Sequence, residues 1–138
     1  MCVFCKIISG EYNSSKIYED DKVLAILDLS QATYGHTLVM PKEHYENIFD
    51  LDEETAKHLF SVVTKIAKHY NCVIPNLKGL NLLNNNGVKA GQTVMHYHMH
   101  IIPRRFDDGL GGAGAWPSFP GAKYELETIH KKVQMVNK

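Results

Sequence analysis

Three histidines alternate with apolar side chains in one short run of the chain: His96, Tyr97, His98, Met99, His100, Ile101 and Ile102. A strand points successive side chains to opposite faces, so the histidines would share one face and the apolar residues the other. Histidines two positions apart on one face lie roughly 6.5–7 Å apart, close enough for one ligand to engage two of them. The run therefore predicts a strand with one side in the core and one side available for chemistry.

Imidazoles gathered in this way suit two kinds of chemistry. A metal ion is held by three or four converging N, S or O ligands, and a straight strand offers at most two alternate residues to one ion. A histidine that attacks phosphorus needs one free ring nitrogen, with the other held by a hydrogen bond that fixes the tautomer. His98, flanked by the other two histidines, is best placed for that attack. The spacing alone leaves both chemistries open.

The residues around this run resemble a known family. The segments that carry the resemblance are Asn85, 90–94, 96–103, 20–30 and 35–44. The first three resemble the signature of the histidine-triad (HIT) family, and the last two are similar to its nucleotide-binding, HINT-type branch. The match covers residues 2–106, and the tail at 107–138 is looser. It implies one HIT domain over residues 1–138, an α+β fold with an antiparallel sheet of about five strands, one long helix and a C-terminal helix.

The resemblance also implies an activity. In this family the middle histidine attacks the α-phosphate of a nucleotide and becomes a covalent nucleotidyl-histidine, and His98 occupies that position here. His100 would donate to a phosphate oxygen or the leaving group, and His36 would join the cluster from a neighbouring strand. The implied function is a hydrolase or nucleotidyl transferase acting on purine nucleoside phosphoramidates. The alternatives are a dinucleoside polyphosphate hydrolase and a nucleotide-binding regulatory protein with incidental turnover.

Two further classes of enzyme are disfavoured. A metal-dependent hydrolase that used the three histidines of the run as ligands would need accompanying carboxylates, and no such cluster is evident in the sequence. The chain also carries no Walker-type glycine loop, so no magnesium requirement of the P-loop kind is expected.

The nucleotide would be held by polar and apolar residues together. Asp28 ends a predicted strand, and one carboxylate there can accept hydrogen bonds from both ribose hydroxyls. Asn85, Gln92 and Thr93 carry donors for the ribose or the phosphate, although the last two also suit a capped turn. Apolar positions match the purine slot of HINT-type proteins: Val3, Phe4, Ile7, Ile26 and Leu29. Such a slot holds a base by area and stacking, which discriminates poorly among purines.

Cys2 and Cys5 form a second constellation, a Cys-x-x-Cys pair at the N-terminus. This spacing is typical of redox motifs or of half a zinc site, and two free cysteines are the alternative. Zinc needs two more ligands, for which His44 and His96 are the candidates. Some bacterial HIT proteins that this chain resembles carry such a Cys2His2 zinc, which would be structural and dispensable to the chemistry.

Composition agrees with one small enzyme domain. The 138 residues suffice for a single core, and 15 basic residues balance 15 acidic ones. The net charge therefore gives no reason to expect nucleic acid or a membrane surface as a partner. Because no apolar run approaches ~18 residues and no signal-peptide pattern opens the chain, we expect a cytoplasmic protein.

Periodicity divides the chain into short strands and helices. Strands are predicted at 16–19, 23–28, 37–41, 80–83 and 97–102. A first short helix is expected at 4–8, ended by Gly10, and a terminal helix at 124–136. A long helix should begin after an Asp50–Glu53 capping pair. Its apolar residues recur at helical spacing: Ala56, Leu59, Phe60, Val63, Ile66, Ala67 and Tyr70.

A homodimer is expected. One small sheet with one flanking helix leaves a sheet edge and part of the helix uncovered. Val62 lies off the main apolar stripe, which would widen the apolar face of the helix beyond what one sheet needs. HIT proteins of this type pair two protomers about a two-fold axis. The segment around Trp116 would then reach the partner's site, although the glycines nearby depart from the HINT-type pattern.

Overall fold

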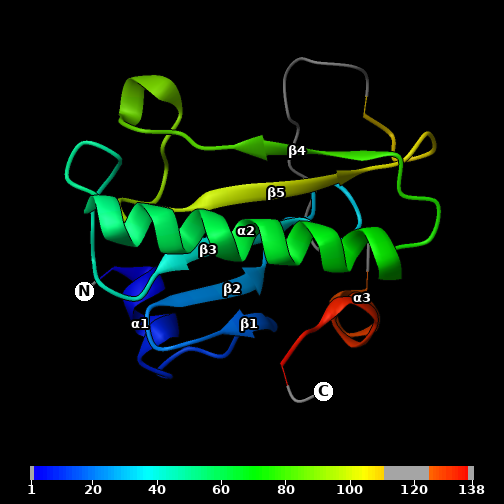
Figure 1. The fold of residues 1–138 in the computed structure, drawn as a ribbon, viewed down its shortest axis with the longest axis horizontal. Coiled ribbons are helices and arrows are strands. Elements are labelled where there is room, and N and C mark those ends of the chain that lie inside the picture. Colours follow the sequence, from blue (N-terminus) through cyan, green and yellow to red (C-terminus); the bar gives the residue numbers. More distant parts are fainter. Residues whose placement is uncertain (1, 111–124, 137–138) are drawn as a thin grey trace.

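The computed structural model describes residues 2–110 and 125–136, which form one five-stranded antiparallel sheet with helices on both faces (Figure 1). The strands are β1 (Lys16–Glu19), β2 (Val23–Leu27), β3 (Thr37–Pro41), β4 (Gly79–Leu83) and β5 (Met99–Arg104), in the order β1-β2-β3-β5-β4. The helices are α1 (Val3–Ile8), α2 (Glu53–Val73) and α3 (Leu126–Val133), with one 3-10 turn, η1 (Val88–Ala90). The predicted α+β fold is confirmed, although α3 is shorter than the predicted terminal helix.

The core lies on both sides of the sheet, as β2 shows most clearly. All five of its residues are buried because alternate side chains enter two different clusters. Val23, Ala25 and Leu27 face the large cluster beneath α2, which crosses the sheet in Figure 1. Leu24 and Ile26 face a smaller cluster on the opposite side, closed by α1. The functional residues described below lie on this second side.

The N-terminus of α2 differs from the sequence prediction. Asp52 is the N-cap, and its carboxylate accepts a hydrogen bond from the amide of Thr55 at 3.1 Å. The prediction that Asp50 caps the helix is wrong. The Asp50 carboxylate instead accepts from the amides of Glu46 and Asn47, so it holds the preceding turn. Acidic residues follow both Asp50 and Asp52, so the sequence does not show which of the two caps the helix. That depends on the backbone conformation.

The buried stripe of α2 consists of Leu59, Val62, Val63, Ile66 and Tyr70. The expectation that Val62 widens an outward face is therefore wrong, since its side chain is fully buried in the core. Positions 59, 62, 63, 66 and 70 follow the i, i+3, i+4, i+7 pattern of a single helix face. Phe60, which the sequence placed on the stripe, is 53% exposed instead.

Strand β5 begins at Met99, two residues later than predicted. Val39 pairs with Met99 in the β3–β5 ladder, so the continued register would set Tyr97 opposite Pro41. Proline has no amide hydrogen to donate, and the ladder ends before it. The Tyr97 amide donates to the Tyr45 carbonyl at 2.7 Å instead. His96 and His98 therefore stand in an irregular segment ahead of β5, and His100 alone of the three lies within the strand.

The two edges of the sheet differ. At β1, the amides of Met135 and Val136 donate to the carbonyl of Ile17, and the His130 ring bonds the carbonyl of Lys16. The segment after α3 therefore covers this edge. At the other edge, β4 pairs with β5 alone among the described strands. No helix within residues 2–110 and 125–136 is long and apolar enough to cross a membrane.

Candidate active site

His36, His98 and His100 form one cluster on the sheet face opposite α2. His100 stands on β5 and His36 immediately precedes β3, which is the neighbouring strand. The ring centroids are 5.2 Å apart for His36 and His100 and 5.0 Å apart for His98 and His100. Tyr97 and Ile101 point into the core beneath α2, so the predicted alternation of faces holds even where the strand has not yet begun.

His98 is held with one ring nitrogen engaged. Its Nδ1–H donates to the carbonyl oxygen of His96 at 2.8 Å, which fixes the tautomer with a lone pair on Nε2. No described residue hydrogen-bonds to that Nε2. Burial lowers the pKa of His98, so the ring is neutral near pH 7. The Phe4 ring packs edge-on against it with centroids 5.0 Å apart. His98 therefore offers a fixed, neutral nucleophile.

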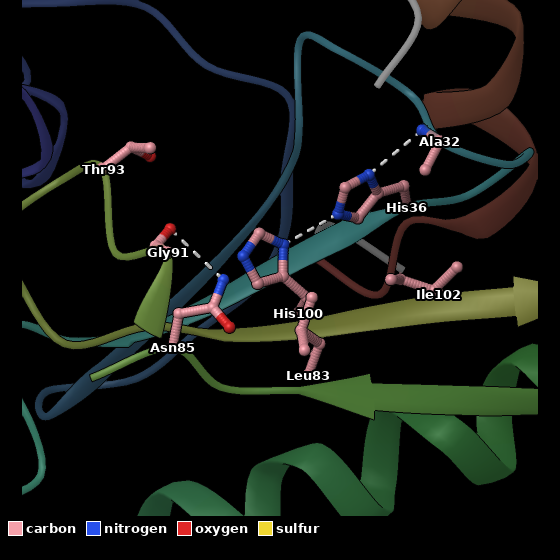
Figure 2. Close-up of a pocket in the computed structure, with 8 residues that line it drawn as sticks. All are labelled: Ala32, His36, Leu83, Asn85, Gly91, Thr93, His100 and Ile102. Atoms are coloured by element: carbon pink, nitrogen blue, oxygen red, sulfur yellow. Dashed lines mark hydrogen bonds between the residues drawn. The ribbon is translucent and has the colours of Figure 1, made fainter. Parts of the chain in front are cut away.

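His36 and His100 form a short hydrogen-bonded relay (Figure 2). The amide of Ala32 donates to Nδ1 of His36 at 3.1 Å, so Nε2 carries the proton and donates to Nδ1 of His100 at 2.9 Å. Burial lowers the pKa of each ring to about 4, so both are neutral near pH 7. The relay leaves the Nε2–H of His100 as a donor.

The loop before β3 fixes the position of His36. Gly35 has φ +92°, a conformation that favours glycine, and a Cβ there would lie a tight 3.2 Å from the Ile74 side chain. The buried Gln31 accepts from the Gly35 amide and donates to the carbonyls of Asp28 and His36. Gln31 was not among the predicted site residues. The feature that could have identified Gln31 is its long amide side chain, which stands among the small residues Ser30, Ala32 and Thr33 between two predicted strands.

Two cavities open beside the histidines. One of about 280 Å³ is lined by Phe4, Asp28, Ser30, Leu38, Thr93, Val94, His98 and His100. The other, of about 230 Å³, is lined by Ala32, His36, Leu83, Asn85, Gly91, Thr93, His100 and Ile102 (Figure 2). Thr93 and His100 line both, so the cavities meet at the histidine cluster. Neither set of lining residues includes lysine or arginine.

Asp28 follows β2 and stands where the first cavity meets His36. One carboxylate oxygen accepts from the Ser30 amide at 2.9 Å, and the other lies 3.6 Å from Nε2 of His36. Burial raises the pKa of Asp28, which the Ser30 amide partly opposes. The second oxygen remains available to a ligand in the cavity.

The structure separates the predicted apolar slot into three parts. Phe4 lines the first cavity, while Ile26 and Ile7 belong to the cluster behind it. Val3 and Leu29 do not line it, and their side chains are 42% and 73% exposed. The wall is completed by two residues that were not among the predicted slot residues, Leu38 and Val94.

Gln92 does not fit its predicted role as a phosphate donor. Its side chain is buried, and its amide group donates to the carbonyls of Glu46 and Val94. Its oxygen accepts from the Gly87 amide at 2.7 Å. These bonds join the loop ahead of β5 to the loop around Glu46, so Gln92 shapes the loop that carries Thr93. This outcome matches the turn-capping alternative.

Cys2, Cys5, His44 and His96 converge on one point at the N-terminus of α1. The six separations among their Sγ and Nδ1 atoms lie between 3.1 and 3.6 Å. Donors around a tetrahedral zinc ion are about 3.3–3.8 Å apart, as bond lengths of 2.0–2.3 Å require. The four side chains therefore fit a tetrahedral metal ion with slight expansion.

Other contacts also suit a metal at this cluster. Nε2–H of His96 donates to the Pro41 carbonyl at 2.8 Å, which turns the Nδ1 lone pair toward the cysteines. The Cys5 amide donates to Sγ of Cys2 at 3.1 Å. Burial and the neighbouring Cys2 thiol raise the pKa of Cys5, so a cation beside it would favour the Cys5 thiolate.

The sheet order and the histidine cluster define a class of small α+β proteins that carry their chemistry on, and just ahead of, the second strand after the long helix. Comparison with known proteins agrees. The HIT domain model matches residues 9–107. Protein hit of Bacillus subtilis is 55% identical over 115 residues, which span 83% of this chain and 78% of that protein. The chain belongs to the HIT family.

Two further similarities bear on the chemistry. Adenosine 5'-monophosphoramidase hnt1 of Schizosaccharomyces pombe is 36% identical over 132 residues, 96% of this chain and 95% of that protein. The crystal structure of a zinc-bound histidine triad family protein from Mycobacterium smegmatis superposes with a TM-score of 0.83 at 35% identity, covering 96% of this chain and 90% of that one. Named nucleotide hydrolases thus occur among the relatives, which supports that activity at the level of the family.

Proposed function

We propose that the protein hydrolyses purine nucleoside phosphoramidates through a covalent nucleotidyl-histidine at His98. One observation carries the proposal. Nδ1 of His98 donates to the His96 carbonyl, which leaves the lone pair on Nε2 free to attack a substrate. His98 lines a cavity large enough for a nucleoside. The similarity to a relative named as an adenosine 5'-monophosphoramidase supports the same activity.

The residues divide the reaction between them. Nε2 of His98 attacks the α-phosphorus, and the phosphorus–nitrogen bond breaks as the leaving amine takes a proton from solvent. The His96 carbonyl stabilises the positive charge on the His98 ring, and Nε2–H of His100 donates to a phosphoryl oxygen. Water then adds to phosphorus, its proton passes to solvent, and the nucleotide leaves with His98 restored. Asp28 holds the ribose hydroxyls during both steps.

The charges of the cavities favour an amine leaving group over a polyphosphate. A dinucleoside polyphosphate brings several negative charges, whereas neither set of lining residues offers a cationic side chain. Rates for a panel of adenosine and guanosine phosphoramidates and dinucleoside polyphosphates test this. We expect kcat/KM for phosphoramidates to be at least ~10-fold higher, since charge-assisted bonds to the extra phosphates are missing. Faster cleavage of dinucleotides would favour the alternative hydrolase, and nucleotide binding without turnover would favour a regulatory protein.

We propose zinc as the metal held by Cys2, Cys5, His44 and His96. Two thiolates and two imidazoles are a donor set that zinc prefers, and the zinc-bound relative adds support. The ion would tie α1 to the segments that carry His44 and His96, and no step of the reaction passes through it. The described cysteines form no disulfide, which supports a reducing, cytoplasmic location.

We also propose a homodimer that joins α2 and β4 of two protomers. The outer side of β4 has no partner strand among the described residues, and Leu82 on that strand is 41% exposed. A groove of about 270 Å³ between α2 and β4 is lined by Ala67, Lys68, Asn71, Leu77, Gly79 and Leu80. Phe60, also exposed on α2, widens this apolar surface. The predicted role of Trp116 in the partner's site lies outside the described residues.

Sedimentation equilibrium at micromolar concentration should give twice the chain mass of 15.6 kDa. Phe60→Glu should shift the population toward monomer, because a charge buried at an isologous contact is introduced twice. Phe49→Glu is a matched control, since Phe49 is 86% exposed in the loop before α2. A fully active monomer would contradict both the pairing and the idea of a shared site.

A further inference from the structure

Asp28, His36 and His100 bring a carboxylate oxygen and two imidazole nitrogens together. Nε2 of His36 lies 2.9 Å from Nδ1 of His100 and 3.6 Å from a carboxylate oxygen of Asp28. All three ligand atoms lie within 4.8 Å of one another. The histidine run contains no carboxylate of its own, but the fold brings Asp28 to it from the end of β2. The cluster shares no residue with the Cys2–Cys5 site.

Two imidazoles and one carboxylate are a common donor set for divalent transition metals, with coordination positions left over. Ligands at about 2.1 Å from an ion and at right angles to one another lie about 3.0 Å apart. The separation of the two histidine nitrogens already matches that value. The Asp28 oxygen lies 3.6 Å from Nε2 of His36, about half an ångström beyond that value, and within 4.8 Å of the His100 nitrogen.

The surroundings of His36 allow it to act as a ligand. Its Nε2 must then lose the proton that it shares with His100, and the proton must move to Nδ1. Nδ1 lies 3.1 Å from the Ala32 amide but also 3.2 Å from the carbonyl oxygen of Ser30. The Ser30 carbonyl can accept that proton, as a backbone carbonyl commonly does behind a metal-bound histidine. His36 thus has a partner for either tautomer, one for the relay and one for a metal.

We propose that Asp28, His36 and His100 form a second, weaker site for a borderline divalent cation such as zinc or cobalt, and that a cation there excludes the nucleotide. Asp28 and His100 both line the cavity assigned to the nucleoside. A bound ion occupies the carboxylate oxygen and a nitrogen of His100, so neither group is free for ribose or phosphate. Excess metal therefore inhibits the enzyme at its own histidines. The exclusion of nucleotide, though not the metal site itself, rests on the proposed function.

Cobalt distinguishes the two sites because thiolate ligands give it an intense charge-transfer absorption. Titration of metal-free protein with cobalt should show that absorption for the first equivalent only. A second equivalent should add weak d–d bands without further charge transfer. Adenosine has no phosphate that could bind the metal itself. At 100 times its own Kd it should raise the apparent Kd for the second cobalt ~100-fold, as mutually exclusive binding requires.

Asp28→Asn should weaken the second equivalent at least ~10-fold and leave the first unchanged. Asp21→Asn removes an exposed carboxylate elsewhere and should change neither. His100→Asn provides a second test of the same site should Asp28→Asn fold poorly. A single equivalent of cobalt in the wild type, or a second one that both variants bind as tightly, would overturn the proposal. Because metal uptake is measured without nucleotide, this result stands apart from whether the protein hydrolyses phosphoramidates.

Discussion

Replacing His98 with asparagine is expected to lower kcat by at least ~10³-fold. The substitution removes the only proposed nucleophile and leaves substrate positioning and electrostatic stabilisation, which sustain little of the rate without covalent catalysis. His98→Asn should keep the native circular dichroism, because the altered side chain faces the cavity and not the cluster beneath α2. Steady-state rates on a nucleoside phosphoramidate measure the effect.

His58→Asn is the matched control. His58 lies on α2 and bonds the Asp20 carboxylate at 2.7 Å, away from both cavities, so its loss should leave kcat unchanged. Rapid quenching of the wild type during turnover should trap an acid-labile nucleotidyl group on His98, which the His98→Asn variant cannot form. Turnover by His98→Asn close to the wild-type rate would refute the covalent route.

Replacing Cys2 and Cys5 together with serine should lower the melting temperature by about 10 °C. Loss of a structural zinc ion of this type removes at least ~3 kcal/mol from the free energy of unfolding. For a chain of this size, that loss corresponds to a fall in melting temperature of about 10 °C. We expect kcat to stay within about tenfold of wild type. The His96 ring keeps its bond to the Pro41 carbonyl without the metal, so the His96 carbonyl still holds His98.

Cys72→Ser tests whether the effect is specific to the pair. Cys72 is exposed near the end of α2, outside the four-residue cluster, and its substitution should leave both zinc content and melting temperature unchanged. Elemental analysis should find one tightly bound zinc per chain in wild-type protein purified without chelator. Protein that carries no zinc, or a double variant that melts with the wild type, would argue directly against a structural ion.

Alternation and helical spacing placed most of the secondary structure. Predicted strands 16–19 and 37–41 coincide with β1 and β3, because short-range patterning encodes which side chains face the core. The errors arise where the outcome depends on partners distant in sequence. The start of β5 depends on Pro41 in a different strand, and the burial of Val62 depends on how α2 is rotated against the sheet.

The candidate site shows the same division. Cys2 and His96 are 94 positions apart in the sequence, and their proximity was predicted from the family resemblance. The spacing of the residues alone does not predict it. The approach of Asp28 to His36 was not predicted at all, since it arises from the loop that Gln31 pins between β2 and β3. Gln92 was predicted to bind the ligand because its amide donor can be read from the sequence. One of the acceptors that the amide bonds, the Glu46 carbonyl, lies 46 positions away and cannot be read in the same way.

The unequal edges of the sheet limit how far the molecule can associate. The carbonyls of Lys16 and Ile17 on β1 are occupied by His130 of α3 and by residues 135–136, while the outer side of β4 has no partner strand among the described residues. A unit that can be extended at two ends would polymerise into fibres, but a unit with one available end stops growing once two copies have met. The segment after α3 thus covers the β1 edge. In the proposed dimer, loss of residues 134–138 should free the Ile17 carbonyl for pairing with another chain, and sedimentation should then show species larger than two chains.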